Sequence, residues 1–212
     1  MNYFHVYICD MKIIEKKRTY RMSERAEQVA RNDQKILDAT SDLWLEVSLP
    51  ELTLEKVAQN SGVTVRTILR KFGSREGLIK ACIENSGLEL SRKRMEVTPG
   101  DLTGILDILL EEYEAMGNAL IRTLTVEYDF PSTKELLVNA RSIHRDWCAY
   151  AFAPFLPSNK SEDYETVLSA FIAVTEFYLW KLLRKDLGKS PEECRQVFRL
   201  MLDSLVSKSK IQ

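Results

Sequence analysis

The sequence has few of the residues from which metal, redox and catalytic sites are built. Its 212 residues include only two histidines and four cysteines. The cysteines, Cys9, Cys82, Cys148 and Cys194, lie far apart, without a CxxC or other zinc-ligand spacing. We interpret them as buried or incidental thiols in a reducing cytosol. We predict no metal site and no cofactor.

Catalytic and membrane signals are equally scarce. The chain has no nucleophile elbow, phosphate-binding loop or metal-ligand motif, so we do not expect an enzyme. His144 and Cys148 share a predicted helix face, but no third ligand lies near them, and packing is the preferred interpretation. No apolar run approaches the ~18 residues of a membrane span, and residues 1–14 lack the features of a signal peptide. These absences favour a cytoplasmic protein without a membrane partner.

The composition that remains is that of a soluble globular protein. Apolar residues make up 45% of the chain and charged residues 29%, and the length suffices for one large or two small domains. No convincing strand run is present. The net charge of −1 does not suggest a nucleic-acid binder as a whole, but this average hides a basic segment within a balanced or acidic remainder.

Residues 1–22 do not fit the periodicity of the chain that follows. One interpretation is that the start is placed too early and that Met22 or Met11 is the true first residue. The other is a disordered basic arm, because lysines and arginines outnumber acids here, and such arms can follow a DNA groove or backbone.

Residues 53–72 have the pattern of two short helices joined by a tight turn. Thr53 and Thr64 are suited to cap the two helices, and Gly62 can adopt the left-handed conformation that redirects the chain between them. Ile68 falls on the buried side of the second helix. Together with a bracing helix over residues 25–46, this pattern predicts a three-helix head containing a helix-turn-helix.

The second of these short helices is basic and free of acids. The segment from Gly62 to Arg75 carries four cations, Arg66, Arg70, Lys71 and Arg75. Such a run can be merely a solvated face, but here it lies on the outer side of the motif. We therefore predict a DNA-binding unit in which Arg66 bonds a guanine.

Arg75 opens the following helix, where its charge opposes the helix dipole by roughly 0.3–1 kcal/mol. A DNA phosphate at this helix terminus would remove the conflict.

Residues 31–83 resemble the DNA-binding head of the tetracycline-repressor (TetR) family of transcription regulators. The resemblance rests on ILDAT and LW in the first helix, on TLEKVAQNSGVTVRTILRKF, and on the SREGLI that follows. It implies a homodimer that binds a palindromic double-stranded DNA operator and releases it when a small-molecule ligand occupies the C-terminal domain.

By position, the resemblance and the basic face together predict a set of DNA-contacting residues: Thr53, Thr64, Val65, Arg66, Thr67, Leu69, Arg70, Lys71 and Arg75. Thr53, Thr64 and Arg75 would contact phosphates. Two positions depart from the family, which usually has tyrosine in place of Leu69 and often histidine in place of Lys71. Leu69 cannot make the tyrosine's phosphate hydrogen bond, and Lys71 is a candidate replacement contact.

The rest of the chain predicts an all-α fold, with a head over residues 23–76 and a regulatory and dimerisation domain over residues 77–212. The expected helices span residues 101–115, 117–127, 131–153, 162–187 and 191–208. The last has an N-cap, a first-turn proline and a capping-box glutamate in Ser190 to Glu193. The last two helices also resemble the family's dimerisation pair, which gives a predicted interface of Phe171, Val174, Tyr178, Leu182, Val197, Met201 and Leu205.

The middle helices carry the candidate ligand pocket. Its predicted lining is Tyr113, Met116, Glu127, Arg141, His144, Trp147, Tyr150 and Phe177, although helix-spaced aromatics are more often ordinary core. The leading functional prediction is a ligand-responsive repressor. The alternative is a TetR-like regulator controlled by a protein partner, or one without any small-molecule ligand.

Overall fold

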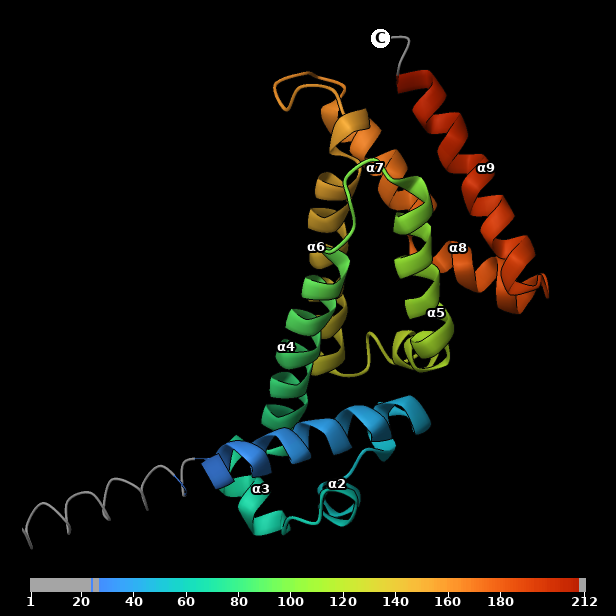
Figure 1. Cartoon of the computed structure of the whole chain (residues 1–212). Coiled ribbons are helices and arrows are strands. Elements are labelled where there is room, and N and C mark those ends of the chain that lie inside the picture. Colours follow the sequence, from blue (N-terminus) through green and yellow to red (C-terminus); the bar gives the residue numbers. More distant parts are fainter. Residues whose placement is uncertain (1–23, 25–26, 210–212) are drawn as a thin grey trace, which may run out of the picture.

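The computed structural model describes residue 24 and residues 27–209, and the regular secondary structure of the described part is all helical. The predicted arm or alternative start over residues 1–22 lies outside the described residues. Figure 1 shows the elements, which are the first helix (residues 27–46), η1 (Leu49–Glu51), α2 (Leu54–Ser61), α3 (Val65–Phe72), α4 (Arg75–Arg94), α5 (Leu102–Leu124), α6 (Pro131–Ala151), η2 (Ala153–Phe155), α7 (Tyr164–Thr175), α8 (Phe177–Lys181), the π-helical turn η3 (Leu182–Asp186) and α9 (Pro191–Ser209).

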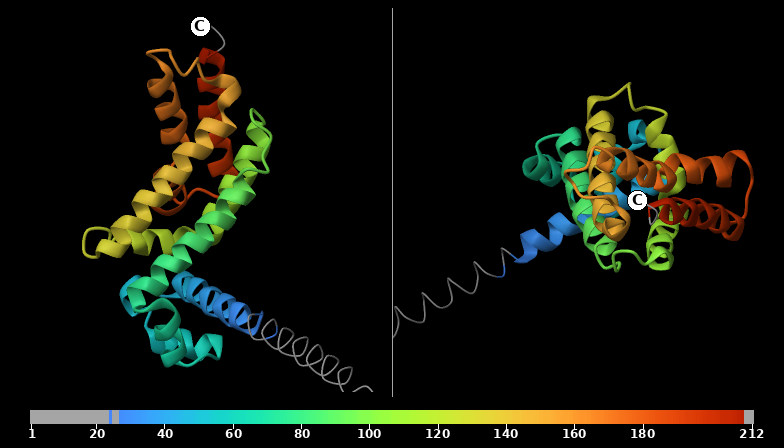
Figure 2. Two further views of the ribbon diagram at one scale, coloured as in Figure 1. Left: turned by 90° about the vertical axis from the view of Figure 1, so that its left-hand side faces the viewer. Right: turned by 90° about the horizontal axis from the view of Figure 1, so that it is seen from above.

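The first helix, α2 and α3 form a head at one end of the molecule (Figure 1). Its core is built around Ile36, Val57 and Ile68, each with no exposed surface. Leu78 and Ile79 from the start of α4 complete this core. The far part of α4 runs beside α6 (Figure 2). The same helix therefore belongs to the head at one end and to the rest of the protein at the other.

Helices α5 to α9 form the body, which has its own core. Phe152 stacks on Phe171 with ring centroids 4.4 Å apart. Trp180 and Phe198 are also buried in this cluster. The Ser190 cap of α9 is confirmed, because its hydroxyl accepts from the Glu193 amide while the Glu193 carboxylate accepts from the Ser190 amide.

The predicted break near residues 115–117 is wrong, because α5 runs unbroken from Leu102 to Leu124. Gly117 lies in the middle of this helix. A Cβ atom at Gly117 would lie 2.1 Å from the Cη2 atom of Trp180. The glycine therefore allows the indole to pack directly on the α5 backbone, which is a tertiary requirement that local sequence does not reveal.

The predicted helix over residues 162–187 is interrupted at Glu176, whose backbone is extended with φ −71° and ψ 146°. The Tyr113 hydroxyl donates to the Thr175 carbonyl at 2.9 Å and so satisfies a carbonyl at the end of α7. Tyr164–Asp186 is long and apolar enough, by length and composition, to cross a membrane. In the structure this segment is broken, and Phe171 and Trp180 within it pack in the body core.

Candidate DNA-binding face and joint cavity

The turn between α2 and α3 has the predicted geometry. Thr53 Oγ1 accepts from the Lys56 amide at 3.3 Å, and Thr64 Oγ1 accepts from the Thr67 amide at 3.3 Å. Gly62 has φ 68°, in the left-handed region. Both threonine caps and the glycine turn are therefore confirmed, and they fix the direction in which α3 leaves the turn.

The outer face of α3 presents free cations. Arg66 and Arg70 are exposed, and within the described residues neither side chain makes a hydrogen bond or ion pair. Leu69 is 41% exposed beside them, while Val65 and Thr67 are half-buried. Because Ile68 holds the opposite side of α3 in the head core, this face points away from the protein and is available to an anion.

The other two predicted cations already have partners inside the head. Lys71 Nζ lies 2.6 Å from an Asp33 carboxylate oxygen. Arg75 Nε donates to the Leu52 carbonyl at 2.6 Å, and its Nη2 donates to the Leu49 carbonyl. Arg75 thus ties the start of α4 to the segment before α2. Phosphate contacts by Lys71 and Arg75 stay predictions, and each would compete with these bonds.

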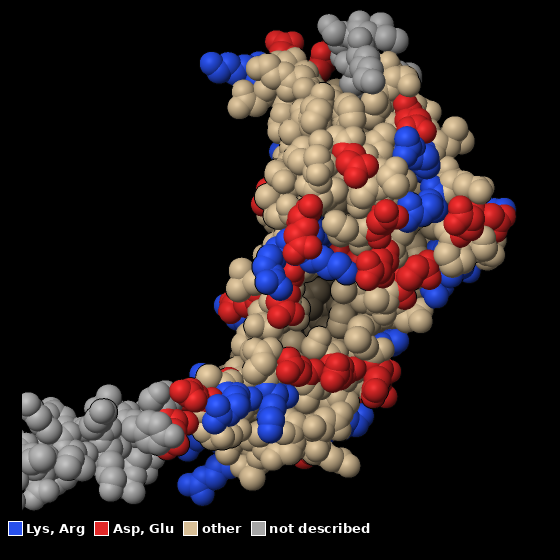
Figure 3. All heavy atoms as spheres, viewed as in Figure 1, with Lys and Arg blue, Asp and Glu red and all other residues tan. Residues whose placement is uncertain are grey.

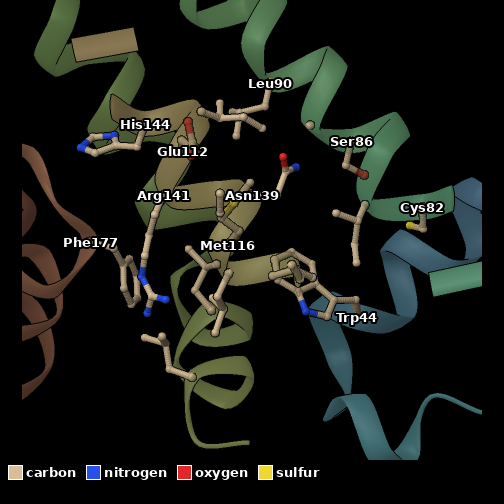
Figure 4. Close-up of a pocket in the computed structure, with 18 of the residues that line it drawn as sticks. Trp44, Cys82, Ser86, Leu90, Glu112, Met116, Asn139, Arg141, His144 and Phe177 are labelled. Carbon is tan, nitrogen blue, oxygen red and sulfur yellow. The ribbon is translucent and has the colours of Figure 1, made fainter. Parts of the chain in front are cut away.

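A cavity of about 200 Å³ lies at the joint between the head and the body. It is visible as a hollow in the surface in Figure 3, and Figure 4 shows part of its lining. Trp44, Leu49 and Leu52 line it from the head side, and α4, α5, α6 and α8 supply the other walls. The lining is mostly aliphatic and aromatic, which is typical of a small-molecule site.

Two ion pairs lie at this cavity. Arg94, which is 3% exposed, makes a bidentate pair with Glu112 at 2.8 and 2.7 Å. Arg141 makes a second bidentate pair with Glu127 at 2.6 and 3.0 Å. The hydrogen bonds from Arg141 hold the pKa of the Glu127 carboxyl below its ordinary value. Both guanidinium groups are therefore already neutralised by carboxylates.

The His144 ring connects this cluster to α7. Burial and the Arg94 charge lower the pKa of His144 to about 3, so the ring is neutral at pH 7. Arg94 Nη1 lies 3.2 Å from His144 Nδ1, which must accept because the guanidinium can only donate. His144 Nε2 then donates to Thr175 Oγ1 at 3.1 Å. Cys148 Sγ lies 3.6 Å from Nε2, within the same buried cluster.

Residues 36–82 match the family model described as bacterial regulatory proteins, tetR family. This segment is therefore a DNA-binding domain of the TetR family. The chain is 26% identical over 179 residues to the HTH-type transcriptional regulator BetI of Burkholderia cenocepacia, covering 79% of this chain and 89% of that protein. BetI of Burkholderia orbicola matches with the same identity and coverage.

A solved structure supports the fold. A Pseudomonas aeruginosa PAO1 protein assigned as a transcriptional regulator superposes with a TM-score of 0.60 over 82% of this chain and 90% of that one, at 12% identity. TetR-family proteins are DNA-binding transcription regulators, so the predictions of a regulator and of no enzyme are confirmed by the family.

The structure brings together most of the predicted pocket residues. Tyr113, Met116, Arg141, His144 and Phe177 line the cavity, and several of them are labelled in Figure 4. The other three predicted residues lie outside the lining. Glu127 pairs with Arg141, Trp147 Nε1 donates to the Arg94 carbonyl at 3.0 Å, and the Tyr150 hydroxyl donates to the Val97 carbonyl at 3.3 Å.

The predicted dimer residues divide into two groups. Phe171 is fully buried and Val174 is 7% exposed, so both belong to the core of their own protomer. By contrast, Tyr178 is 49%, Leu182 43% and Met201 36% exposed. Val197 and Leu205 are partly buried against the body core. The dimer interface itself stays a prediction, and its exposed candidate residues are Tyr178, Leu182 and Met201.

The head's contribution to the cavity lining was not predicted from the sequence. Trp44 lines the cavity and its Nε1 donates to Thr123 Oγ1 at 2.9 Å. Arg122 Nη2 donates to the Leu45 carbonyl at 2.7 Å and lies 3.2 Å from the Trp44 carbonyl. We call these bonds the head–body latch. They join positions almost eighty residues apart, and no periodicity in the sequence indicates them.

Proposed function

We propose that this TetR-family regulator is a cytoplasmic repressor that binds a palindromic operator as a homodimer and is controlled by a small molecule. The observation that carries the proposal is that one cavity is walled by both the DNA-binding head and the body. An occupant of this cavity would touch the head directly. A solid joint would have favoured a regulator without a ligand.

The DNA-reading step relies on the outer face of α3. The first residues of the second helix in a helix-turn-helix meet base edges in the major groove. Arg66 is exposed, has no hydrogen-bond or ion-pair partner among the described residues and lies in this position, so it is the proposed base contact, bidentate to guanine. Arg70 is the proposed backbone contact. Thr53 and Thr64 are proposed to contact phosphates through the helix N-termini that they cap.

Dimerisation would place two such heads in successive grooves. Exposed apolar side chains on α8, η3 and α9, namely Tyr178, Leu182, Leu200 and Met201, supply the proposed interface. Leu200 is 68% exposed. A two-fold axis through this surface would match the symmetry of a palindrome, whose half-sites lie about 34–36 Å apart.

Control would follow from the head–body latch. Trp44 is shared between the cavity wall and the bond to Thr123, so a ligand that moves the indole also acts on the contact that fixes the head. A ligand that binds better to the displaced arrangement shifts the population toward it. The two recognition helices would then no longer fit successive grooves.

Selection of bound sites from random duplex DNA tests the DNA-reading part. We expect a palindromic site bound by two chains. Arg66→Ala should cost about 1–3 kcal/mol on that site and relax preference at one base pair. Arg92→Ala removes the same charge from the far end of α4, where Arg92 is exposed, and should leave the preference unchanged. Equal effects of the two substitutions would contradict the assignment of Arg66.

A further inference from the structure

The charged groups at the joint cavity do not balance. Arg94 is neutralised by Glu112 and Arg141 by Glu127, and the His144 ring is neutral. Glu176 is the remaining charged residue of the lining. Among the described residues, the one basic side chain within 4 Å of its carboxylate is His144, with 3.9 Å between Nε2 and a carboxylate oxygen. The cavity therefore holds one carboxylate without a cationic partner.

The fold places Glu176 at the cavity. Glu176 is the extended residue between α7 and α8, so its side chain projects from a helix break and not from a packed helix face. The carboxylate is 27% exposed, and burial raises its pKa from the ordinary value. A hydrogen bond from the Phe177 backbone opposes this shift, but among the described residues no lysine or arginine pairs with the carboxylate. A carboxylate without a cationic partner in a mostly apolar cavity carries a desolvation penalty that a cationic ligand would relieve.

The rest of the cavity lining is suited to the apolar part of a ligand. Trp44, Leu90, Met116 and Phe177 face the space from four different elements. A cavity of about 200 Å³ equals the volume of about seven water molecules, which limits the enclosed part of the ligand to a small molecule. An anionic ligand is disfavoured, because both arginines at the cavity already hold carboxylates.

From this geometry we infer that the effector is a small, mostly apolar organic cation, such as a protonated alkylamine, whose charged group binds Glu176. The inference rests on the proposed function, since it names the ligand class of the same cavity. The apolar part lies between Trp44 and Met116, and the ammonium group donates to the carboxylate. Neither group changes its covalent structure.

Binding of three matched probes, hexylammonium, hexanol and hexanoate, tests the inference. Trp44 lines the cavity, whereas Trp147 and Trp180 are buried in the body core. Quenching of tryptophan fluorescence by a probe therefore reports cavity occupancy if it is absent in the Trp44→Phe variant. Hexylammonium should bind about tenfold to a hundredfold more tightly than hexanol, as expected for one charge-assisted hydrogen bond. Hexanoate should bind most weakly.

The Glu176→Gln variant should lose the preference for the amine and keep the binding of hexanol. Glu162→Gln serves as the matched control, because Glu162 is exposed and lies outside the cavity. Equal affinities for amine and alcohol, persistence of the preference in Glu176→Gln, or binding of none of the probes would each overturn the inference. Site selection without any ligand still tests the DNA-binding function, so the two failures are distinguishable.

The pH dependence provides a second readout. The group in question is the Glu176 carboxylate, faced by the Arg94 and Arg141 charges, the neutral His144 ring and the Tyr113 hydroxyl. The ionised carboxylate is needed to bind the amine. Affinity for hexylammonium should therefore fall as the pH drops through the raised pKa of Glu176, while the affinity for hexanol stays constant. Parallel profiles for both probes would contradict the assigned partner.

Discussion

The buried pair of Arg94 and Glu112 gives the sharpest prediction of stability. Their side chains are 4% and 7% exposed, and both oxygens of the carboxylate accept from the guanidinium. Glu112→Gln leaves a buried arginine opposite a neutral amide. Breaking one partner of such a pair costs about 3–5 kcal/mol. Replacing both, in Arg94→Met with Glu112→Leu, should cost far less, because no charge stays unpaired.

Urea unfolding at a fixed chain concentration measures this difference, since the proposed dimerisation would make the midpoint depend on concentration. We expect a lower midpoint for Glu112→Gln than for the double variant, and a coupling energy well above the ~0.5 kcal/mol seen for independent sites. A loss below about 1 kcal/mol for Glu112→Gln, or additive effects of the two substitutions, would refute the idea that this pair is a desolvated unit.

Two further substitutions test separate features. Gly117→Ala should lower the free energy of unfolding by about 1–3 kcal/mol, since the added methyl meets Trp180; an unchanged midpoint in urea would show that the indole relaxes freely. Arg75→Ala should cost about 1–3 kcal/mol in thermal unfolding, because it removes the donor to the Leu49 and Leu52 carbonyls. If Arg75 also contacts phosphate, the salt slope of DNA binding falls by about one unit in the same variant.

Local chemistry made the head predictable. Thr53, Gly62 and Thr64 act within three residues of their partners, so capping and turn rules were enough to place them. The same holds for the Ser190 cap of α9. The all-α class followed from helical periodicity and the lack of strand runs, and the family followed from a motif that is continuous in the sequence.

Long-range packing was not predictable in the same way. Gly117 in the unbroken α5 packs against Trp180, and the Thr175 carbonyl at the break before Glu176 accepts from the Tyr113 hydroxyl. Each contact joins positions about sixty residues apart. Residues from the body side of the cavity were predicted, but those from the head side, including Trp44, were not. The head side of the lining depends on how the head and the body pack together, and each has its own apolar periodicity. Periodicity identifies a buried face but does not identify its partner.

In the proposed mechanism, the occupant of the joint cavity sets the affinity of the head for DNA. Operator affinity of a Met116→Trp variant tests it without any ligand, because Met116 lines the cavity from α5, far from the α3 face. The larger side chain should fill the space, abolish hexylammonium quenching of Trp44 and weaken operator binding in a folded protein. An unchanged operator affinity in a variant that no longer binds the amine would contradict the claim.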